Sequence, residues 1–213
     1  MPAKTKRNPS GKGRPTADDG RRKLARLLAV ASNEFSQHGF RAVTMRGVAD
    51  KARVSTRTLY NRYDDKLSLF KACLEFESMA FPTPDPAPGE PVDAVLERYA
   101  AGVVRALSTD ASLRLAMLVY REGLKFPELL RAAEAHEDRL LIQPLAVYLR
   151  QAGLERAGST ELAKILLGMA LVEWQRAGSF RRPPPNEDDI VRHARLAVRT
   201  FLHGASPVDG QAQ

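Results

Sequence analysis

Residues 53–63, RVSTRTLYNRY, concentrate side chains that donate or accept hydrogen bonds. The segment holds three arginines, two tyrosines, three hydroxyl residues and one asparagine, and it contains no acidic residue. Arginine can bind guanine through two hydrogen bonds, asparagine can bind adenine in the same way, and threonine or tyrosine can reach a methyl group or a phosphate. Because only Val54 and Leu59 offer aliphatic side chains for a core, the segment indicates an outward-facing surface suited to a nucleic acid.

The distribution of charge also favours a polyanionic partner for the first third of the chain. Residues 1–23 carry eight basic and two acidic side chains, residues 24–66 carry eight and four, and residues 67–213 carry seventeen and nineteen. The net charges are therefore +6, +4 and −2, which sum to the +8 of the whole chain. A basic tail could serve solubility alone, but the second basic block lies within sequence of helical periodicity.

The elements that must position these side chains are predicted to be helices. Gly39 is expected to end a first helix, and Thr44 and Ser55 are expected to cap two short helices over 44–51 and 55–63. The first helix is indicated by apolar residues at helical spacing, namely Leu24, Leu27, Leu28, Ala31 and Phe35. Two short helices joined by a tight turn can place the second helix in the major groove of DNA while the first braces it.

The remainder of the chain predicts a larger helical body. Asp64 or Asp65 is expected to cap a fourth helix, and residues 81–91, with five prolines, are expected to connect two helical bodies. No window shows the period-two alternation of a strand, so the predicted fold class is all-α. Five further helices are predicted, over 92–108, 111–125, 127–152, 159–178 and 187–203.

These patterns divide the chain into four predicted parts. We expect a disordered basic arm over 1–20, a helix-turn-helix DNA-binding domain over 21–66, a helical domain over 67–204 and a disordered tail over 205–213. The arm could follow the DNA backbone or enter a minor groove, or it could serve solubility alone. Its basic residues are Lys4, Lys6, Arg7, Lys12 and Arg14.

Other classes of protein find little support in the sequence. No run of 18 apolar residues occurs, and no apolar stretch follows the basic N-terminus, so neither a membrane span nor a signal peptide is expected. Cys73 is the only cysteine and the four histidines are scattered, so no metal site is predicted. No catalytic triad order or glycine-rich phosphate loop is found, and we predict a cytoplasmic protein that is not an enzyme and has no cofactor.

The segment TMRGVADKARVSTRTLYNRYDDKLSLF, residues 44–70, resembles the DNA-binding signature of the TetR/AcrR family of bacterial transcriptional regulators. The segment FSQHGFRAVTM, which overlaps its start, resembles the sequence that usually precedes this signature in the family. The whole match covers residues 22–75. The resemblance implies an N-terminal three-helix helix-turn-helix domain and a larger C-terminal helical domain for ligand binding and dimerisation.

The resemblance also implies DNA-contacting residues. Thr56, Arg57 and Asn61 occupy positions that read bases, and Lys66 occupies the position of a phosphate-binding lysine. The full set of implied contacts is Arg46, Ser55, Thr56, Arg57, Thr58, Tyr60, Asn61, Arg62 and Lys66. The chain departs from the family pattern at Gly47 and Leu67, and at Arg53, where the family has a glycine. A positive φ at Arg53 would cost on the order of 1 kcal/mol.

The family's last two long helices pair with those of a second subunit, and its C-terminal domain binds an effector. The implied dimerisation residues are Leu162, Ile165, Leu166, Met169, Ile190, Ala194, Val198 and Phe201. The implied ligand-binding residues are Met117, Tyr120, Phe126, Leu141, Tyr148, Met169 and Trp174. A core role is the alternative for each of them. No constellation of buried acids or arginines stands out, so a lipophilic effector is expected rather than a sugar.

Three functions are consistent with these patterns. The first is a homodimeric, ligand-responsive repressor that binds a palindromic operator in double-stranded DNA. The second is a helical protein that binds a small molecule or acts as an enzyme, and in which the basic N-terminal third has no role in function. The third is a protein that coats DNA without sequence preference, which would not need Thr56, Arg57, Tyr60 and Asn61 together. The operator, the regulated genes, the effector and the sign of regulation stay open at this point.

Overall fold

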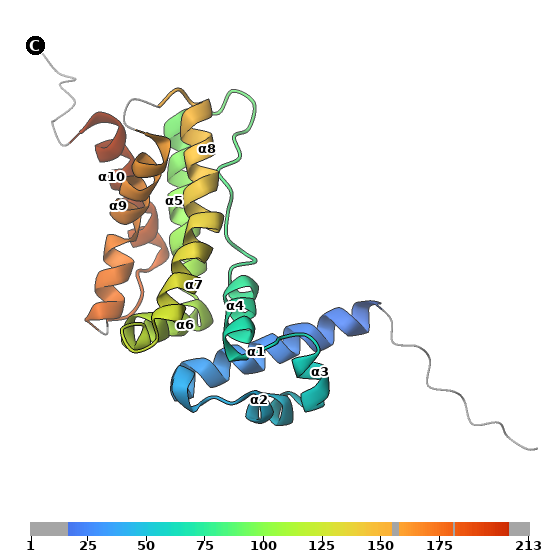
Figure 1. Cartoon of the computed structure of the whole chain (residues 1–213). Coiled ribbons are helices and arrows are strands. Elements are labelled where there is room, and N and C mark those ends of the chain that lie inside the picture. Colours follow the sequence, from blue (N-terminus) through green and yellow to red (C-terminus); the bar gives the residue numbers. More distant parts are fainter. Residues whose placement is uncertain (1–16, 155–157, 181, 205–213) are drawn as a thin grey trace, which may run out of the picture.

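The computed structural model describes residues 17–154, 158–180 and 182–204, and these residues form ten α-helices, one π-helical turn and no strand. The all-α prediction is confirmed. Figure 1 shows an upright bundle that contains α5 and α8–α10, with α1 crossing its lower end and α2 and α3 beneath α1. Residues 1–16 of the predicted arm and the predicted tail, 205–213, lie outside the described residues.

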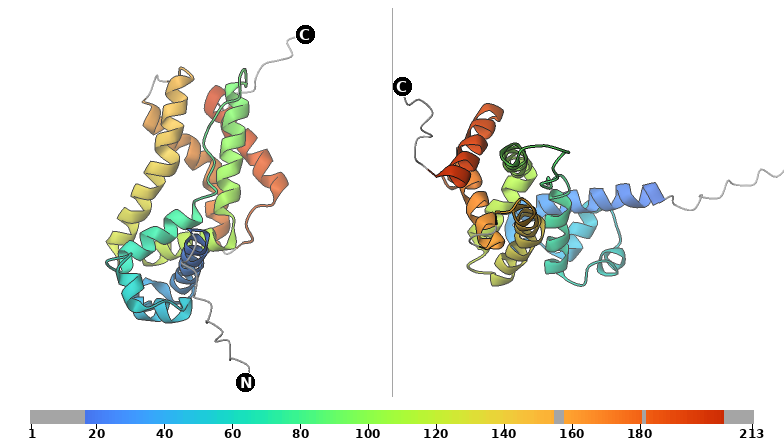
Figure 2. Two further views of the ribbon diagram at one scale, coloured as in Figure 1. Left: turned by 90° about the vertical axis from the view of Figure 1, so that its right-hand side faces the viewer. Right: turned by 90° about the horizontal axis from the view of Figure 1, so that it is seen from above.

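The first helix, α1 (Ala17–Ala42), begins earlier than predicted. Residues 17–20 were expected to belong to the disordered arm, but they are helical, with Asp18 and Asp19 in the first turn. Acidic side chains there interact favourably with the positive end of the helix dipole. Gly39 interrupts the helix as predicted, with a φ of 81° and a ψ of 162°, although helical geometry resumes up to Ala42. In Figure 2, α1 projects sideways from the bundle.

Three shorter helices follow, α2 (Met45–Ala52), α3 (Thr56–Tyr60) and α4 (Lys66–Glu77). The third is shorter than the predicted 55–63. After Tyr60 the chain turns, and it must reach the extended backbone of Asp65, whose carboxylate caps α4 by accepting a hydrogen bond from the Ser68 N–H at 2.7 Å. Asn61 and Arg62 therefore lie in a turn rather than within the helix.

The larger body holds the remaining six α-helices. α10 packs along α5, α8 packs along α9, and α6 crosses α1. No helix in the described part of the chain is long and apolar enough to span a membrane. The six helices are α5 (Val92–Leu107), α6 (Asp110–Glu122), α7 (Pro127–Glu137), α8 (Gln143–Gln151), α9 (Ser159–Ser179) and α10 (Glu187–His203).

The single helix predicted over 127–152 is interrupted by a π-helical turn, Asp138–Ile142. Pro144 has no N–H to donate to the carbonyl four residues earlier, which loosens the helical ladder at this point. The Gln143 N–H reaches back five residues to Asp138 O. Tyr99, buried in α5, donates its hydroxyl to Leu141 O at 3.0 Å, so another helix satisfies a carbonyl of the turn.

Two hydrophobic cores result. One lies within the bundle and is built from α5, the π-helical turn and α8–α10. The other, which we call the head core, is formed by side chains of α1–α4 and includes Leu115, Leu118, Val119 and Leu129 from α6 and α7. We refer to α1–α4 as the head. The predicted domain boundary at residue 66 therefore does not coincide with an edge of the head core, because helices of the larger body complete it.

Candidate DNA interface and ligand cavity

The turn between α2 and α3 is held by capping bonds and by a small core. Thr44 Oγ1 accepts a hydrogen bond from the Gly47 N–H at 3.1 Å, and Ser55 Oγ accepts one from the Thr58 N–H at 3.0 Å. These bonds satisfy backbone donors that the first turn of a helix leaves open. Leu59 of α3 is fully buried in the head core. One face of α3 is therefore packed, and the other is free.

Arg53 adopts the left-handed conformation in this turn. Its φ of 57° and ψ of 44° make it the one non-glycine residue with positive φ in the described part of the chain. Its N–H closes α2 by donating to Ala49 O and Asp50 O. The condition considered for this departure from the family pattern is therefore met, and a non-glycine residue in this conformation costs about 1 kcal/mol.

Most of the side chains predicted to bind DNA are exposed on or beside this motif. Arg57 and Tyr60 are exposed on α3, and the exposed Asn61 follows directly after it. The Ser55 and Thr58 hydroxyls lie 2.6 Å apart and share a hydrogen bond. The exposed members of the predicted set are Arg46, Ser55, Arg57, Thr58, Tyr60, Asn61 and Arg62, and the half-buried members are Thr56 and Lys66.

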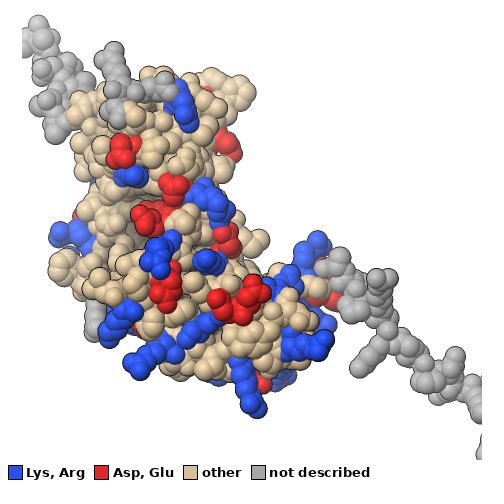
Figure 3. All heavy atoms as spheres, viewed as in Figure 1, with Lys and Arg blue, Asp and Glu red and all other residues tan. Residues whose placement is uncertain are grey.

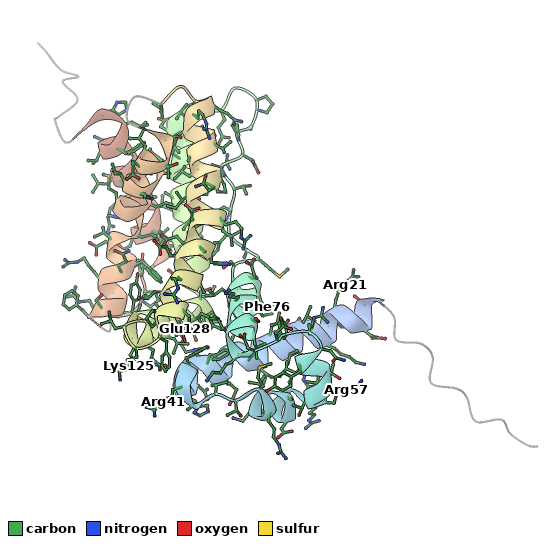
Figure 4. The ribbon with its side chains drawn as sticks, viewed as in Figure 1. Arg21, Arg41, Arg57, Phe76, Lys125 and Glu128 are labelled. Carbon is green, nitrogen blue, oxygen red and sulfur yellow. The ribbon has the colours of Figure 1, made fainter. Side chains whose placement is uncertain are left out.

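Several arginines of this surface have no partner within the protein. The guanidinium groups of Arg46, Arg53 and Arg57 form no ion pair or hydrogen bond with any residue that the structure describes. In the bundle, by contrast, Arg98 binds Glu90 at 2.7 Å. Figure 4 shows Arg57 at the lower end of the molecule, and basic side chains project from that end in Figure 3. Unpaired cations grouped in this way suit a phosphate backbone.

Lys66, the predicted phosphate ligand, is turned inward in this structure. Its Nζ donates to Phe40 O at 2.6 Å and to Arg41 O at 3.3 Å, and it lies 4.6 Å from the centroid of the Phe40 ring. Burial lowers the pKa of Lys66, and Glu122 opposes that shift. The ammonium group therefore satisfies carbonyls at the end of α1. A phosphate contact stays a prediction that would have to use its remaining N–H.

Glu122 of α6 also binds the backbone of Phe40, the residue whose carbonyl accepts the hydrogen bond from Lys66. Its Oε2 accepts a hydrogen bond from the Phe40 N–H at 2.9 Å. Gly39 has a positive φ, and a Cβ added to it would lie 2.2 Å from Glu122 Oε1. The carboxylate thus occupies the space that a side chain at Gly39 would need. We refer to Glu122, Gly39, Phe40 and Lys66 together as the α1–α6 latch.

A cavity of about 450 Å³ lies among α4, α6, α7 and α9. Three of the seven predicted ligand-binding residues line it, namely Tyr120, Leu141 and Trp174. Leu115 and Val119 of α6 belong to both the cavity wall and the head core. The cavity and the head core therefore share side chains.

The other four predicted ligand residues do not line this cavity. Tyr148 is buried in the bundle core, Phe126 packs against the head core, and Met117 lies close to Gly178. Met169 is half-buried on α9. Their role as ligand contacts stays a prediction, since large apolar side chains fill cores as readily as they line cavities.

The predicted dimerisation residues also divide by their position. Leu166, Ile190, Ala194 and Val198 are buried in the core of the bundle. These four side chains face the protein's own helices, and their assignment to a subunit interface stays a prediction. Leu162, Met169 and Phe201 are half-buried, and Ile165 is 53% exposed.

An apolar strip nevertheless lies on the outer side of α9. Ile165, Gly168, Met169 and Val172 follow one another at intervals of three, one and three residues, which places them on one helix face. Val172 is 38% exposed, and nothing lies within 4 Å of a Cβ added to Gly168. Leu196 of α10 is also exposed, at 59%.

Sequence reasoning missed the polar groups around the cavity. Glu77 of α4 and Glu134, His136 and Glu137 of α7 all line it. The spacing of Glu134 and Glu137 places them on one face of α7, but no local pattern connects them with Glu77. No group of three or more His, Cys, Asp or Glu side chains in the described residues is arranged to hold a metal ion.

His136 links α7 to α4. Its Nε2 lies 2.7 Å from Ser78 Oγ, and its Nδ1 lies 3.2 Å from Glu75 Oε1. Burial lowers the pKa of His136, although Glu75 opposes the shift. These contacts hold the last turn of α4 against α7, the helix that carries Glu134 and Glu137.

Comparisons with known proteins agree with the geometry of the head. A family model described as bacterial regulatory proteins, tetR family, matches residues 27–73. The HTH-type transcriptional repressor KstR2 of Rhodococcus jostii (strain RHA1) is 40% identical over 58 residues, which are 26% of this chain and 28% of that repressor. The chain thus matches little more than a quarter of the length of this relative.

Solved structures resemble most of the chain. A putative TetR-family transcriptional regulator from Mesorhizobium loti MAFF303099 has a TM-score of 0.66 and 23% identity, over 85% of this chain and 96% of that one. The flavonoid-responsive regulator FrrA has a TM-score of 0.68 and 22% identity, over 88% of this chain and 99% of that one. These likenesses show the fold. The match to the tetR family model is confined to residues 27–73, which hold the helix-turn-helix, and over the remainder of the chain the similarity is one of fold.

Proposed function

We propose that the protein is a sequence-specific transcriptional regulator that acts as a ligand-responsive, homodimeric repressor. The observation that carries the proposal is the free face of α3, where Arg57, Tyr60 and Asn61 are exposed beside unpaired arginines. We infer that α3 lies in the major groove while α2 braces it against the backbone. Such a regulator acts on chromosomal DNA in the bacterial cytoplasm. KstR2, which matches over the head, is named as a repressor.

The dimer is proposed from the surface of α9 and α10. A single head presents only one short recognition helix, and regulators of this kind gain affinity by binding two half-sites about 34 Å apart. A two-fold axis through the strip formed by Ile165, Gly168, Met169 and Val172 would bury these side chains against their copies. The operator is then expected to be palindromic.

We propose that the effector acts through α6. A molecule in the cavity would press on Leu115 and Val119, which also belong to the head core. The same helix holds Phe40 through Glu122. An effector that binds more tightly to the protein when α6 is displaced would favour that conformation. The two heads of the dimer would then no longer match the spacing of successive major grooves of the operator. FrrA, a protein of this fold, is named as flavonoid-responsive, which supports a ligand response.

We infer no enzymatic role for the chain. Cys73 is fully buried, and burial raises the pKa of its thiol to about 12. A thiol with that pKa stays protonated at neutral pH and is a poor nucleophile.

The test is selection of binding sites from a random duplex pool at physiological salt, with the full-length protein. Recovery of a palindrome whose half-sites lie about one helical turn apart is the expected result. Recovery of no motif, together with binding that weakens equally on all duplexes as salt rises, would favour the DNA-coating alternative instead.

A further inference from the structure

The cavity among α4, α6, α7 and α9 has apolar walls. Its volume of about 450 Å³ falls within the range of small-molecule sites, which is roughly 300–1,000 Å³. The aromatic side chains of Phe81, Tyr120 and Trp174 contribute to its lining. Leucine, alanine and valine side chains, among them Leu115 and Val119 of α6, form the aliphatic part of the lining.

The charged groups of this lining are all acidic at neutral pH. Glu77, Glu134 and Glu137 border the cavity, whereas no lysine or arginine does. None of the three carboxylates forms an ion pair with a described lysine or arginine. Two other glutamates of the larger body are paired, since Glu90 binds Arg98 and Glu187 binds Arg105. Glu77 is half-buried, and Glu134 and Glu137 are exposed, but all three border the same apolar cavity.

Hydrogen-bond donors that an anionic ligand would need are partly committed. Trp174 Nε1 donates to Leu107 O at 3.1 Å. Ser78 Oγ lies 2.7 Å from both Leu74 O and His136 Nε2. Glu137 is exposed, but the protein atoms packed around it desolvate the carboxylate, and this desolvation and the neighbouring Glu134 raise its pKa. The environment of Glu137 therefore already disfavours a further negative charge.

We propose that the effector of this cavity is a lipophilic cation, such as an aromatic or alkyl ammonium or phosphonium compound. Its apolar body would contact the leucine and aromatic walls, and its positive charge would lie near Glu77, Glu134 and Glu137. A lipophilic anion of the same size would meet three like charges and no cation. This inference rests on the proposed ligand response and adds the charge of the ligand to it.

The chain offers a direct probe of this site. Trp174 is the only tryptophan, and it lines the cavity, so its fluorescence reports occupancy. We would titrate the full-length protein with tetraphenylphosphonium and with tetraphenylborate, ions of similar size and opposite charge, and with neutral triphenylphosphine oxide. Isothermal titration calorimetry would give the affinities. We expect the phosphonium ion to bind about tenfold or more tightly than the borate, with an affinity that falls as salt rises.

Charge-neutral variants test the named carboxylates. Each of Glu77→Gln, Glu134→Gln and Glu137→Gln is expected to weaken phosphonium binding by about three- to tenfold, while triphenylphosphine oxide is unaffected. Glu128→Gln is the matched control, because Glu128 lies on α7 but does not line the cavity. Thermal melts of each variant check that folding is preserved.

The outcomes distinguish the proposed charge preference from the proposed function as a ligand-responsive regulator. Equal or tighter binding of the borate or the neutral probe would overturn the proposed charge preference and leave the cavity as a ligand site. Phosphonium binding that survives in the triple glutamine variant would also overturn it. If no probe alters Trp174 fluorescence, both the charge preference and the cavity site are refuted. Operator binding by the same preparation then decides separately whether the protein is a DNA-binding regulator.

Discussion

At the residue scale, the proposed recognition of bases rests on a few exposed side chains of α3. Arg57 is exposed and has no partner among the described residues, so removing its side chain leaves no buried group unsatisfied. Arg195, which is paired with Glu97 on the bundle, serves as a control of the same residue type far from the head. The two arginines therefore separate base reading from a general loss of positive charge.

We expect Arg57→Ala to weaken operator binding by about 1–3 kcal/mol and to relax the preference at one base pair, because arginine discriminates guanine through two hydrogen bonds. Arg195→Ala is expected to have little effect. The measurement is a competition titration with the selected operator, its single-base variants and random duplex. An equal loss on operator and random DNA would contradict a base-reading role for Arg57.

A second prediction at this scale concerns Glu137, whose pKa is raised by desolvation and by Glu134 and Asp138. The folded protein binds this proton more tightly than the unfolded chain does. The resulting stabilisation is complete below the ordinary pKa of 4.5 and is lost as pH rises through the higher folded-state pKa. At neutral pH the ionised carboxylate therefore destabilises the unliganded protein. The other titratable groups of the cavity lining are Glu77, Tyr120 and His136.

We expect Glu137→Gln to raise the melting temperature at pH 7 and to lose that advantage near pH 4, where the wild-type carboxyl is protonated. Differential scanning calorimetry of both proteins across this range makes the comparison, with Glu128→Gln as control. A stabilisation that persists unchanged at pH 4 would show that desolvation of the charge is not its cause.

At the element scale, the α1–α6 latch sets how closely α6 approaches the end of α1. Gly39 combines a φ of 81° with a position 2.2 Å from Glu122 Oε1 for any added Cβ. We expect Gly39→Ala to destabilise the protein by about 1–3 kcal/mol, because the backbone strain and the contact with the carboxylate add together.

Gly20→Ala is the matched control in the same helix. Nothing lies within 4 Å of a Cβ at Gly20, so alanine there should stabilise the protein by up to about 1 kcal/mol through helix propensity. Urea unfolding of both variants gives the comparison. Similar changes in the two variants would contradict a special role for the Gly39 turn.

The latch also predicts how the cavity communicates with the head. Glu122→Leu removes the acceptor for the Phe40 N–H while α6 continues to line the cavity. We expect effector binding to persist and the effect of ligand on operator affinity to fall by about fivefold or more, which is within the usual range of coupling free energies. Operator titrations with and without the cavity ligand measure this. Glu122→Gln, which keeps a carbonyl acceptor, is expected to retain more of the coupling.

At the scale of the whole molecule, DNA affinity is expected to depend on pairing two heads. Ile165→Lys would place a charge in the middle of the apolar strip on α9, opposite its own copy across a two-fold axis. We expect a monomer and an operator affinity at least about 100-fold weaker, because the two half-sites are then bound independently. Analytical ultracentrifugation and operator titration report the two effects.

Val147→Lys provides the control for that prediction. Val147 is an exposed aliphatic residue on α8, 42% exposed compared with 53% for Ile165. A lysine there is expected to leave both the oligomeric state and the operator affinity unchanged. If Ile165→Lys stays dimeric, the proposed strip is not the subunit interface.

The sequence by itself determined the local architecture. The helix starts at Thr44 and Ser55 and the break at Gly39 were predicted correctly, because caps and breaks depend on residues a few positions apart. The spans of α5, α9 and α10 were predicted to within a residue for the same reason. The exposed face of α3 also followed from local pattern, since burying Leu59 leaves the opposite side of a short helix in solvent.

Only the tertiary structure decided the contacts between distant segments. The Phe40 N–H meets Glu122 across 82 residues of chain, and Glu77 joins Glu134 and Glu137 around one cavity. It also decided that Leu166 faces the bundle core while Ile165 faces outward. A helix with a broad apolar surface does not reveal which part of that surface its neighbours cover. That choice depends on how all the helices pack together, and no local pattern in the chain contains it.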